Sequence, residues 1–125
     1  MLLSLLYMMA AKFVILRHGR SAWNKLNKFT GWNDVPLCDI GVKEANNAAL
    51  LIKNLNTSFD YAFSSNLIRT SKTLSYIHDA VPIKNIIYNN AIQERDYGDL
   101  AGKDKNQILQ QYGSVKLHRW RRGYY

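Results

Sequence analysis

Hydrophobic residues in this chain fall into short continuous runs and into stretches with helical spacing, separated by polar turns. Lys12–Leu16 is a run rich in Val, Ile and Phe, which is typical of a buried strand. Asp60–Ser64 ends in a polar turn and Ile83–Tyr88 follows Pro82, and these segments are predicted to be the second and third strands.

Helical spacing dominates the segments that follow these strands. Asp39 is expected to cap a first helix. Its apolar positions are Val42, Ala45, Ala49 and Ile52. A second helix is predicted over Leu67–Asp79, with Leu67, Leu74 and Ile77 on one face.

The remaining segments are a loop and two short helices. Asn24–Pro36 is polar, contains glycine and tryptophan, and is predicted to be a loop. Asp104–Tyr112 is predicted to be a helix that stops at Gly113, and Val115–Arg122 a further helix. Alternating strands and helices predict an α/β domain with a parallel sheet and right-handed crossovers.

Length and composition fit one globular domain. The chain has 125 residues, 47% of them hydrophobic and 21% charged, with no repeat or Pro/Gly-rich linker. Cys38 is the only cysteine, which excludes an intrachain disulfide and a cysteine-rich metal site. This cysteine usage fits a reducing compartment, so we expect a cytoplasmic protein.

The first residues are apolar but do not indicate membrane insertion. Met1–Met9 is too short to span a bilayer as a helix, and no basic residue precedes it as in a signal peptide. Met9-Ala10-Ala11-Lys12 resembles a natural start. We therefore expect residues 1–8 to be an upstream extension and residues 9–125 to form the domain.

The net charge of +8 indicates an anionic partner. Basic residues are scattered along the chain, apart from a cluster over residues 116–122. A scattered charge favours a site assembled by folding, and no helix-turn-helix, zinc-finger or RNA-binding motif is present. A small, multiply charged substrate is therefore preferred over nucleic acid.

Three polar segments follow predicted strands, and such segments meet at the ligand-binding edge of a parallel sheet. They are Arg17-His18-Gly19, Ser64–Arg69 and Gln93–Gly98. Gly19, which has no side chain, is expected to let another molecule approach the backbone closely. Arg69 falls in the first turn of a predicted helix, where unpaired amides already favour anions.

One histidine, two or more arginines and one glutamate form a consistent set for phosphoryl transfer. A neutral imidazole attacks phosphorus while arginine side chains hold the phosphoryl oxygens. Glu94 is placed to move the proton of the alcohol oxygen. Arginine can supply the charge that magnesium supplies elsewhere, so no metal is expected.

Each residue also has a plain structural interpretation. Arg69 and Arg95 could be solvated charges, and Glu94 could pair with Arg95 or a lysine at the surface. The following residues could serve only turns or packing: Asn24, Thr30, Gly31, Trp23, Trp32 and Trp120.

Taken together, the motifs resemble cofactor-dependent phosphoglycerate mutase, a family of the histidine phosphatase superfamily. The first two are Leu16-Arg17-His18-Gly19-x-Ser21-x-Trp23-Asn24 and Phe29-Thr30-Gly31-Trp32-x-Asp34-Val35-Pro36-Leu37. The next two are Ser65-x-Leu67-x-Arg69-x-x-x-Thr73-Leu74 and Glu94-Arg95-x-Tyr97-Gly98-x-Leu100-x-Gly102-x-x-Lys105. Tyr112-Gly113 and Trp120-Arg121-Arg122 complete the resemblance, which covers about Met9–Tyr125.

The resemblance implies a three-layer α/β/α fold with a mainly parallel sheet, and a role for each site residue. His18 would be the phosphorylated nucleophile and Glu94 the proton donor and acceptor. The residues implied to hold the transferring phosphoryl group are Arg17, Asn24 and Arg69. The residues implied to bind the substrate carboxylate and second phosphate are Thr30, Gly31, Arg95, Tyr97, Lys105, Arg121 and Arg122.

The implied reaction interconverts 3-phosphoglycerate and 2-phosphoglycerate in glycolysis and gluconeogenesis, primed by 2,3-bisphosphoglycerate. Partners would be small phosphorylated three-carbon acids, and a homodimer and a homotetramer both remain open. A histidine-type phosphatase and an inactive module that binds phosphorylated ligands are the alternatives. A nucleic-acid binder is supported only by net charge.

Two departures from the family pattern stand out. Arg20 occupies a position that is usually acidic or an amide, so it would either tighten phosphate binding or repel its neighbours. The chain also resembles only the N-terminal half of a mutase. The other half would bring a second catalytic histidine, for which His78 and His118 are no substitutes, and its absence would leave an uncovered sheet edge and lower activity.

Overall fold

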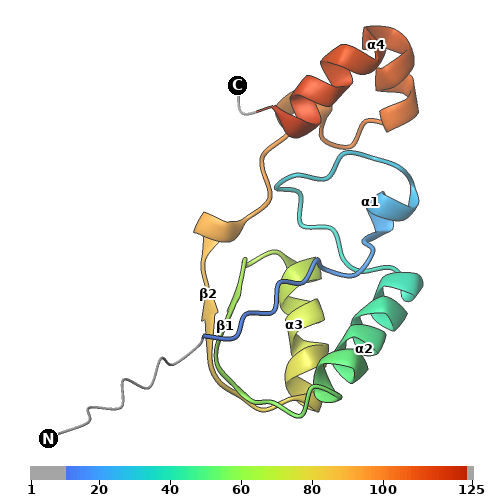
Figure 1. Cartoon of the computed structure of the whole chain (residues 1–125). Helices are drawn as coiled ribbons and strands as arrows, with labels where there is room; N and C mark the ends of the chain where they lie inside the picture. The colour runs from blue at the N-terminus through green and yellow to red at the C-terminus, as the bar shows by residue number, and fades with distance from the viewer. Residues whose placement is uncertain (1–10, 124–125) are drawn as a thin grey trace, which may run out of the picture.

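The computed structural model describes residues 11–123 (Figure 1). The helices are α1 (Ala22–Lys25), α2 (Asp39–Lys53), α3 (Ile68–Ala80) and α4 (Lys105–Arg122). The strands are β1 (Phe59–Ser64) and β2 (Ile83–Tyr88), and two short 3₁₀ turns, Asn90–Ile92 and Gly98–Leu100, follow them. The expected extension over residues 1–8 lies outside the described residues.

The sheet is formed by β1 and β2, which run parallel, with Phe59 opposite Ile83 and Ser64 opposite Tyr88. Helix α3 makes the crossover between them. The predicted α/β class with a parallel sheet is therefore confirmed. β2 has the predicted bounds, whereas β1 begins one residue earlier than expected and α3 is displaced by one residue.

Helices α2 and α3 lie side by side along the sheet (Figure 1). Their shared core consists of Ala49 and Ile52 of α2, Ile77 of α3, and Val81, which directly follows α3. Phe59 packs against this core. Ala45, Ala49 and Ile52 are buried as their spacing predicts, because they lie on one face of a 3.6-residue helix.

Two local predictions about α2 need correction. Cys38, not Asp39, is the N-cap residue, and Asp39 is the first residue of the helix. An acidic side chain in the first turn still interacts favourably with the helix dipole, which explains why Asp39 suits this position without capping it. Val42 is only partly buried.

A second core joins α4 to the loop that precedes α2. Phe29, Ile108 and Leu117 are its buried members, and Tyr97 and Trp120 pack against them. The two predicted terminal helices form one element that is kinked at Gly113, whose φ of 78° is left-handed. Asp104 caps it, because its Oδ1 accepts hydrogen bonds from the Asn106 and Gln107 amides.

The predicted buried strand Lys12–Leu16 is the main error of the sequence analysis. In residues 11–123 this segment belongs to no sheet, and Phe13 and Ile15 are 85% and 96% exposed. A strand exists only through hydrogen bonds to a neighbouring strand, and a local apolar run does not supply that neighbour.

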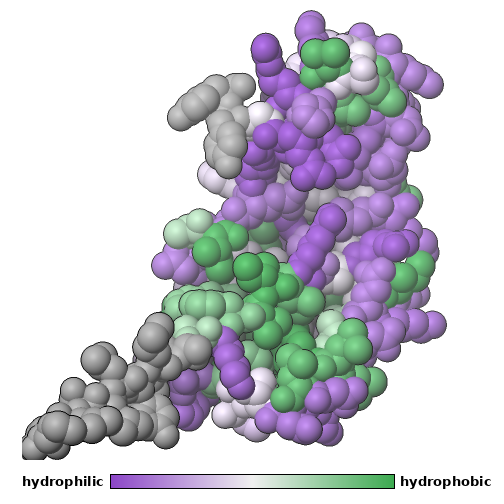
Figure 2. Space-filling view, viewed as in Figure 1, coloured by the Kyte–Doolittle hydropathy of each residue, from purple (hydrophilic) through white to green (hydrophobic). Residues whose placement is uncertain are grey.

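The surface divides into two unlike halves. Figure 2 shows hydrophobic side chains gathered over the half that holds the sheet, whereas the half that holds α4 is mostly hydrophilic. Among the described residues, no helix combines the length and the apolar character needed to cross a bilayer.

Candidate active site

His18 lies half-buried at the end of the extended segment that precedes α1. Its Nδ1 lies 2.7 Å from the Gly19 carbonyl oxygen. Because a carbonyl oxygen only accepts hydrogen bonds, Nδ1 must carry the proton in this contact. The lone pair of a neutral His18 is therefore on Nε2, which is the nitrogen available for attack.

The backbone beside His18 is held by α3 and α2. The Gly19 amide donates to Thr73 Oγ1 at 3.1 Å, and that hydroxyl donates to the Arg69 carbonyl at 2.7 Å. A side chain at Gly19 would collide with the Gly41 backbone in the first turns of α2. The close approach predicted for Gly19 is therefore made by α2 of the same chain.

The surroundings of His18 favour its neutral form. Burial lowers the pKa of His18, and the Arg69 and Arg17 charges lower it further. The hydrogen bond to Gly19 and the Glu94 carboxylate act in the opposite direction but do not reverse the shift. A lowered pKa favours the uncharged, nucleophilic imidazole at neutral pH.

Arg69 is fully buried in the first turn of α3. Its NH1 donates to the Asn33 carbonyl at 2.9 Å, and its NH2 donates to the Gly31 carbonyl at 2.7 Å and to Glu94 Oε2 at 3.0 Å. The alternative of a solvated Arg69 is therefore wrong. A buried guanidinium needs such partners, because an uncompensated charge is costly to desolvate.

Glu94 pairs with Arg69 and not with Arg95 or a lysine, so the surface-pair interpretation is also wrong. The Glu94 side chain is 38% exposed and remains within reach of a ligand. The Trp32 indole donates to the Glu94 backbone carbonyl at 2.7 Å, which ties the Glu94 segment to the Thr30–Asn33 loop. Trp32 is 57% exposed and is thus not the packing residue that was expected.

Thr30 and Gly31 lie at the meeting point of this loop and the Glu94–Gly98 segment. Gly31 has a φ of 57°, and a Cβ there would lie 3.0 Å from the Tyr97 amide nitrogen. Thr30 is buried, and among residues 11–123 its Oγ1 has no hydrogen-bond partner, as is also true of Arg69 Nε. Unpaired buried polar atoms of this kind are expected where a ligand supplies the partner.

Arg95 connects the site to α4. Its NH1 donates to the Trp120 and Gly123 carbonyls, at 3.2 and 2.9 Å, which lie at the end of that helix. Arg121 and Arg122 follow Trp120 and are therefore held on the side of the Glu94 segment. The predicted substrate contact of Arg95 stays a prediction, and the observed contacts give it a structural role as well.

The charges of Arg121 and Arg122 act on Tyr97, and that of Arg121 also acts on Lys105, which indicates that these residues lie near one another. Burial raises the pKa of Tyr97, and Glu94 raises it further, while Arg121 and Arg122 act against this. Burial lowers the pKa of Lys105, and Arg121 lowers it further. Lys105 also lies over the Phe29 ring, 5.7 Å from its centroid.

Asn24 and Arg20 complete the surroundings of His18. The Asn24 Oδ1 accepts from the Ser21 amide and the Ser21 Oγ accepts from the Asn24 amide, a capping box that leaves the Asn24 side-chain NH₂ to donate elsewhere. Arg20 pairs with Glu44 at 3.2 Å, and its amide donates to the same carboxylate at 2.8 Å. Arg20 is thus held toward α2.

Several residues that shape the site were not identified from the sequence. Thr73 stands one turn after Arg69, and this i+4 spacing was the only local indication of a shared role. Asp34 Oδ1 accepts from the Ile68 amide at 2.6 Å and so caps α3 from a distant loop. Nothing in the sequence around Gly41 marks it as a site residue, because the backbone that leaves no room for a side chain there belongs to Arg20, in another segment.

Comparison with known proteins identifies the class. The histidine phosphatase superfamily (branch 1) matches residues 13–125, and the chain belongs to this superfamily. Among its relatives within this superfamily are phosphoglycerate mutases. The chain is 42% identical over 118 residues to the 2,3-bisphosphoglycerate-dependent phosphoglycerate mutase of Allorhizobium ampelinum, covering 93% of this chain and 56% of that protein.

A second mutase and a phosphatase are further relatives. The protein of the same name from Buchnera aphidicola subsp. Baizongia pistaciae is 44% identical over 118 residues, covering 90% of this chain and 50% of that protein. A crystal structure of phosphoserine phosphatase from Entamoeba histolytica in complex with 3-phosphoglyceric acid superposes with a TM-score of 0.63 at 27% identity, covering 82% of this chain and 47% of that chain. The chain thus spans about half the length of the relatives it matches.

Proposed function

We propose that this chain carries the phosphohistidine site of a 2,3-bisphosphoglycerate-dependent phosphoglycerate mutase, with His18 as the nucleophile. One observation carries the proposal. The Nδ1 of His18 donates to the Gly19 carbonyl, and the charges of Arg69 and Glu94, which are themselves paired at 3.0 Å, act on its imidazole, whose pKa is lowered by burial. These three residues come from three segments of the chain, and this grouping supports the roles of nucleophile, phosphoryl-binding cation and proton carrier.

The chemistry follows from the protein's own groups. Nε2 of His18 attacks phosphorus, the N–P bond forms, and the bond from phosphorus to the leaving oxygen breaks. Arg17, Asn24 and Arg69 hold the phosphoryl oxygens as their charge redistributes. Starting from phosphohistidine, the Glu94 carboxylate removes the proton from the hydroxyl group that attacks phosphorus, and it returns this proton to the leaving oxygen in the step that forms phosphohistidine again.

The residues present fit a ligand with two phosphates and a carboxylate. Thr30 Oγ1 and Arg69 Nε are buried polar atoms without a partner in the part of the chain that the structure describes. The charges of Arg121 and Arg17 act on Lys105, so these cations lie near one another. When bound, 2,3-bisphosphoglycerate supplies the phosphoryl group that primes the histidine. The residues proposed to bind the rest of the ligand are Thr30, Gly31, Arg95, Tyr97, Lys105, Arg121 and Arg122. The absence of a metal requirement stays a prediction.

A histidine-type phosphatase is the second candidate. It is favoured by the similarity to a phosphoserine phosphatase, a protein crystallised with 3-phosphoglyceric acid. In this case water, not a substrate hydroxyl, would accept the phosphoryl group from His18. The identity of 42% to 44% with mutases favours the mutase.

The test supplies the chain with radiolabelled 2,3-bisphosphoglycerate and 3-phosphoglycerate, and follows three products. These are acid-labile, alkali-stable phosphoprotein, labelled 2-phosphoglycerate and labelled inorganic phosphate. His18→Ala is compared with His118→Ala, a matched change at an exposed histidine of α4. We expect label on the wild type and on His118→Ala, and none on His18→Ala.

The products then separate the candidates. Label with 2-phosphoglycerate supports the mutase, and label with inorganic phosphate supports the phosphatase in its place. Folded wild-type protein that binds 2,3-bisphosphoglycerate without becoming labelled would be a phospho-ligand-binding module. Because the chain spans about half of its relatives, we expect turnover at least about a hundredfold below theirs.

We also propose that the protein acts in the cytoplasm on small phosphorylated acids. The single cysteine supports this location, because disulfides are not needed to hold the fold. Fractionation of the producing cells tests it, and recovery of the protein in an extracytoplasmic fraction would contradict it.

A further inference from the structure

The peptide unit between Gly19 and Arg20 connects His18 to a carboxylate outside the candidate active site. Its carbonyl oxygen accepts from His18 Nδ1 at 2.7 Å, and its amide donates to Glu44 Oε2 at 2.8 Å. Because a trans peptide is planar, its C=O and N–H bonds point in opposite directions and turn together. An amide that is held by Glu44 therefore keeps the carbonyl directed at His18.

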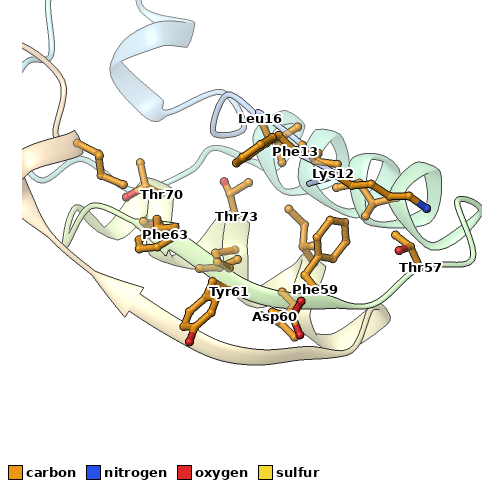
Figure 3. Close-up of a pocket in the computed structure, with 18 of the residues that line it drawn as sticks. Lys12, Phe13, Leu16, Thr57, Phe59, Asp60, Tyr61, Phe63, Thr70 and Thr73 are labelled. Atoms are coloured by element: carbon orange, nitrogen blue, oxygen red, sulfur yellow. The ribbon is translucent and has the colours of Figure 1, made fainter. Parts of the chain in front are cut away.

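This peptide unit depends on its own hydrogen bonds for its orientation. Gly19 has no side chain that would restrict its backbone angles. The backbone on either side is fixed, because the Gly19 amide donates to Thr73 Oγ1 at 3.1 Å and the Cys38 amide donates to the Arg20 carbonyl at 3.0 Å. Figure 3 shows Thr73 projecting from α3 into the pocket that His18 also lines. Neither of these two bonds acts on the peptide unit in between.

The Arg20 side chain holds Glu44 in the position that the amide bond requires. Its NH2 lies 3.2 Å from Glu44 Oε1, which leaves Oε2 for the amide. The two side chains are 47% and 42% exposed, so the ion pair adds little stability by itself. Contacts at both oxygens do fix the orientation of the carboxylate. Arg20, which departs from the family pattern, thereby acquires a structural role.

The contact at Nδ1 decides which nitrogen of His18 can react. Free neutral histidine carries its proton mainly on Nε2, and this tautomer has no lone pair there for an attack. The Gly19 carbonyl stabilises the other tautomer, because only a protonated Nδ1 can donate to it. If the peptide unit turned over, its N–H group would face Nδ1 and favour the unreactive tautomer.

We propose that Glu44 is a positioning residue for His18, which acts through the Gly19–Arg20 peptide unit to keep Nε2 unprotonated. The inference rests on the proposed function, in which Nε2 is the nucleophile. The tautomer itself is a property of the chain without ligand. It can therefore be measured whether or not the chain transfers a phosphoryl group.

Geometry, and not charge, is the means by which Glu44 acts. The charges that act on the pKa of His18 are those of Arg69, Arg17 and Glu94, and Glu44 is not among them. A neutral side chain with an acceptor oxygen in the same place should therefore replace Glu44. Glutamine has such an oxygen, whereas alanine does not.

The test reads the tautomer of His18 by ¹⁵N NMR of the full chain without ligand, at about pH 8, where the imidazole is neutral. The His18 signals are those that are missing from His18→Ala. The wild type should show a protonated Nδ1. Glu44→Ala should lower the fraction with an unprotonated Nε2 about tenfold, and the rate of labelling by 2,3-bisphosphoglycerate should fall by the same factor, since only that fraction can attack.

Three further variants distinguish this role from a merely structural one. Glu44→Gln should keep the tautomer and the labelling rate to within about twofold, because it keeps an acceptor. Arg20→Gln keeps the amide and removes only the guanidinium that holds the carboxylate, so its effect should be smaller than that of Glu44→Ala. Asp79→Ala removes an exposed carboxylate from the last turn of α3 and should change neither quantity. Alanine favours helices, so Glu44→Ala should not weaken α2.

Three results would overturn the proposal. The first is a wild-type His18 with its proton on Nε2, an observation that needs no variant. The second is an unchanged tautomer in folded Glu44→Ala. The third is an equal loss in Glu44→Ala and Glu44→Gln, since charge would then be the cause.

Labelling reports on the proposed function separately. A chain that is never labelled, but whose His18 tautomer follows the change at Glu44, contradicts the proposed function and supports this inference. A chain that is labelled on His18, but whose tautomer is the same in Glu44→Ala, supports the proposed function and contradicts this inference.

Discussion

At the scale of single residues, Arg69 has the most demanding environment in the site. It is fully buried and joins the Gly31 and Asn33 carbonyls to the Glu94 carboxylate. Arg69→Lys keeps a positive charge but loses the planar guanidinium, whose two NH2 groups reach all of these oxygens at the same time. We expect the rate of His18 phosphorylation to fall about a hundredfold or more, measured by quenched-flow labelling.

A control separates this effect from unfolding. Lys84→Arg changes one cation for another at an exposed site that pairs with Asp60, far from the groups that surround Arg69. It should leave the labelling rate unchanged. Equal rates for wild type and a folded Arg69→Lys would contradict the role given to Arg69.

The lowered pKa of His18 predicts how the labelling rate depends on pH. Burial and the nearby arginine charges lower its pKa, so Arg17→Ala should raise the pKa toward the ordinary value by removing one positive charge. Titration of the His18 ring by NMR measures this directly. The labelling rate of the wild type should rise with pH through the lowered pKa and be level by neutral pH; in Arg17→Ala this rise should occur at higher pH.

The same shift affects stability with a definite sign. Because the pKa of His18 is lower in the folded chain, the unfolded chain binds more protons between the two pKa values. This contribution to the free energy of unfolding is therefore present above about pH 6.5 and is lost as pH falls below it. His18→Gln should flatten that part of the urea-denaturation profile, and an unchanged profile would contradict the shift.

Gly41 tests the contact between α2 and the His18 backbone. Helix propensity alone predicts that Gly41→Ala stabilises the chain by about 1 kcal/mol. The Arg20 backbone occupies the space that the new Cβ needs, so we expect a destabilisation of about 1–3 kcal/mol in its place. The sign of the change in urea denaturation decides between the two.

At the scale of elements, the helix that carries Arg69 begins without a capping side chain of its own. Leu67 is its N-cap residue, and Asp34 supplies the acceptor to the Ile68 amide from a distant loop. Asp34→Ala should lower the free energy of unfolding by about 0.5–2 kcal/mol, whereas Asp34→Asn, which keeps an acceptor, should cost less. Equal losses for both variants in urea denaturation would exclude the cap.

Elements that depend on local pattern were predictable from the sequence, and elements that depend on distant partners were not. β2 and α3 follow from an apolar run after proline and from helical spacing. Lys12–Leu16 has an equally strong strand pattern, but no neighbouring strand accompanies it in residues 11–123. The pattern gives the preference of a segment, and pairing decides whether it becomes a strand.

The site divides in the same way. The chemistry of His18, Arg69 and Glu94 could be anticipated because residue type and position after a strand carry it. Trp32, Asp34 and Gly41 could not, because each acts through a contact with a segment far away in the sequence. The resemblance to a known family supplied roles for residues, and geometry supplied the contacts that hold them.

At the scale of the whole molecule, the charge and the apolar surface lie on different halves. The residues proposed to bind the rest of the ligand include Lys105, Arg121 and Arg122 of α4 and Arg95, which is bonded to its end. That half is mostly hydrophilic, whereas hydrophobic side chains gather over the half that holds the sheet (Figure 2). 2,3-Bisphosphoglycerate should therefore raise the melting temperature by binding the folded state, and added salt should reduce this rise. Arg121→Ala with Arg122→Ala should remove most of it, and Lys84→Ala should not. If 2,3-bisphosphoglycerate still raised the melting temperature of the double variant, the ligand would bind at a site that does not include Arg121 and Arg122.

The central claim is that His18 is phosphorylated on Nε2, and ³¹P–¹⁵N NMR of the labelled chain tests it most directly. Because Nδ1 donates to the Gly19 carbonyl, the predicted spectrum shows one phosphohistidine, with phosphorus coupled to Nε2 of His18. This signal should be missing from His18→Ala. Phosphorus on Nδ1, or a phosphohistidine that persists in His18→Ala, would contradict the account.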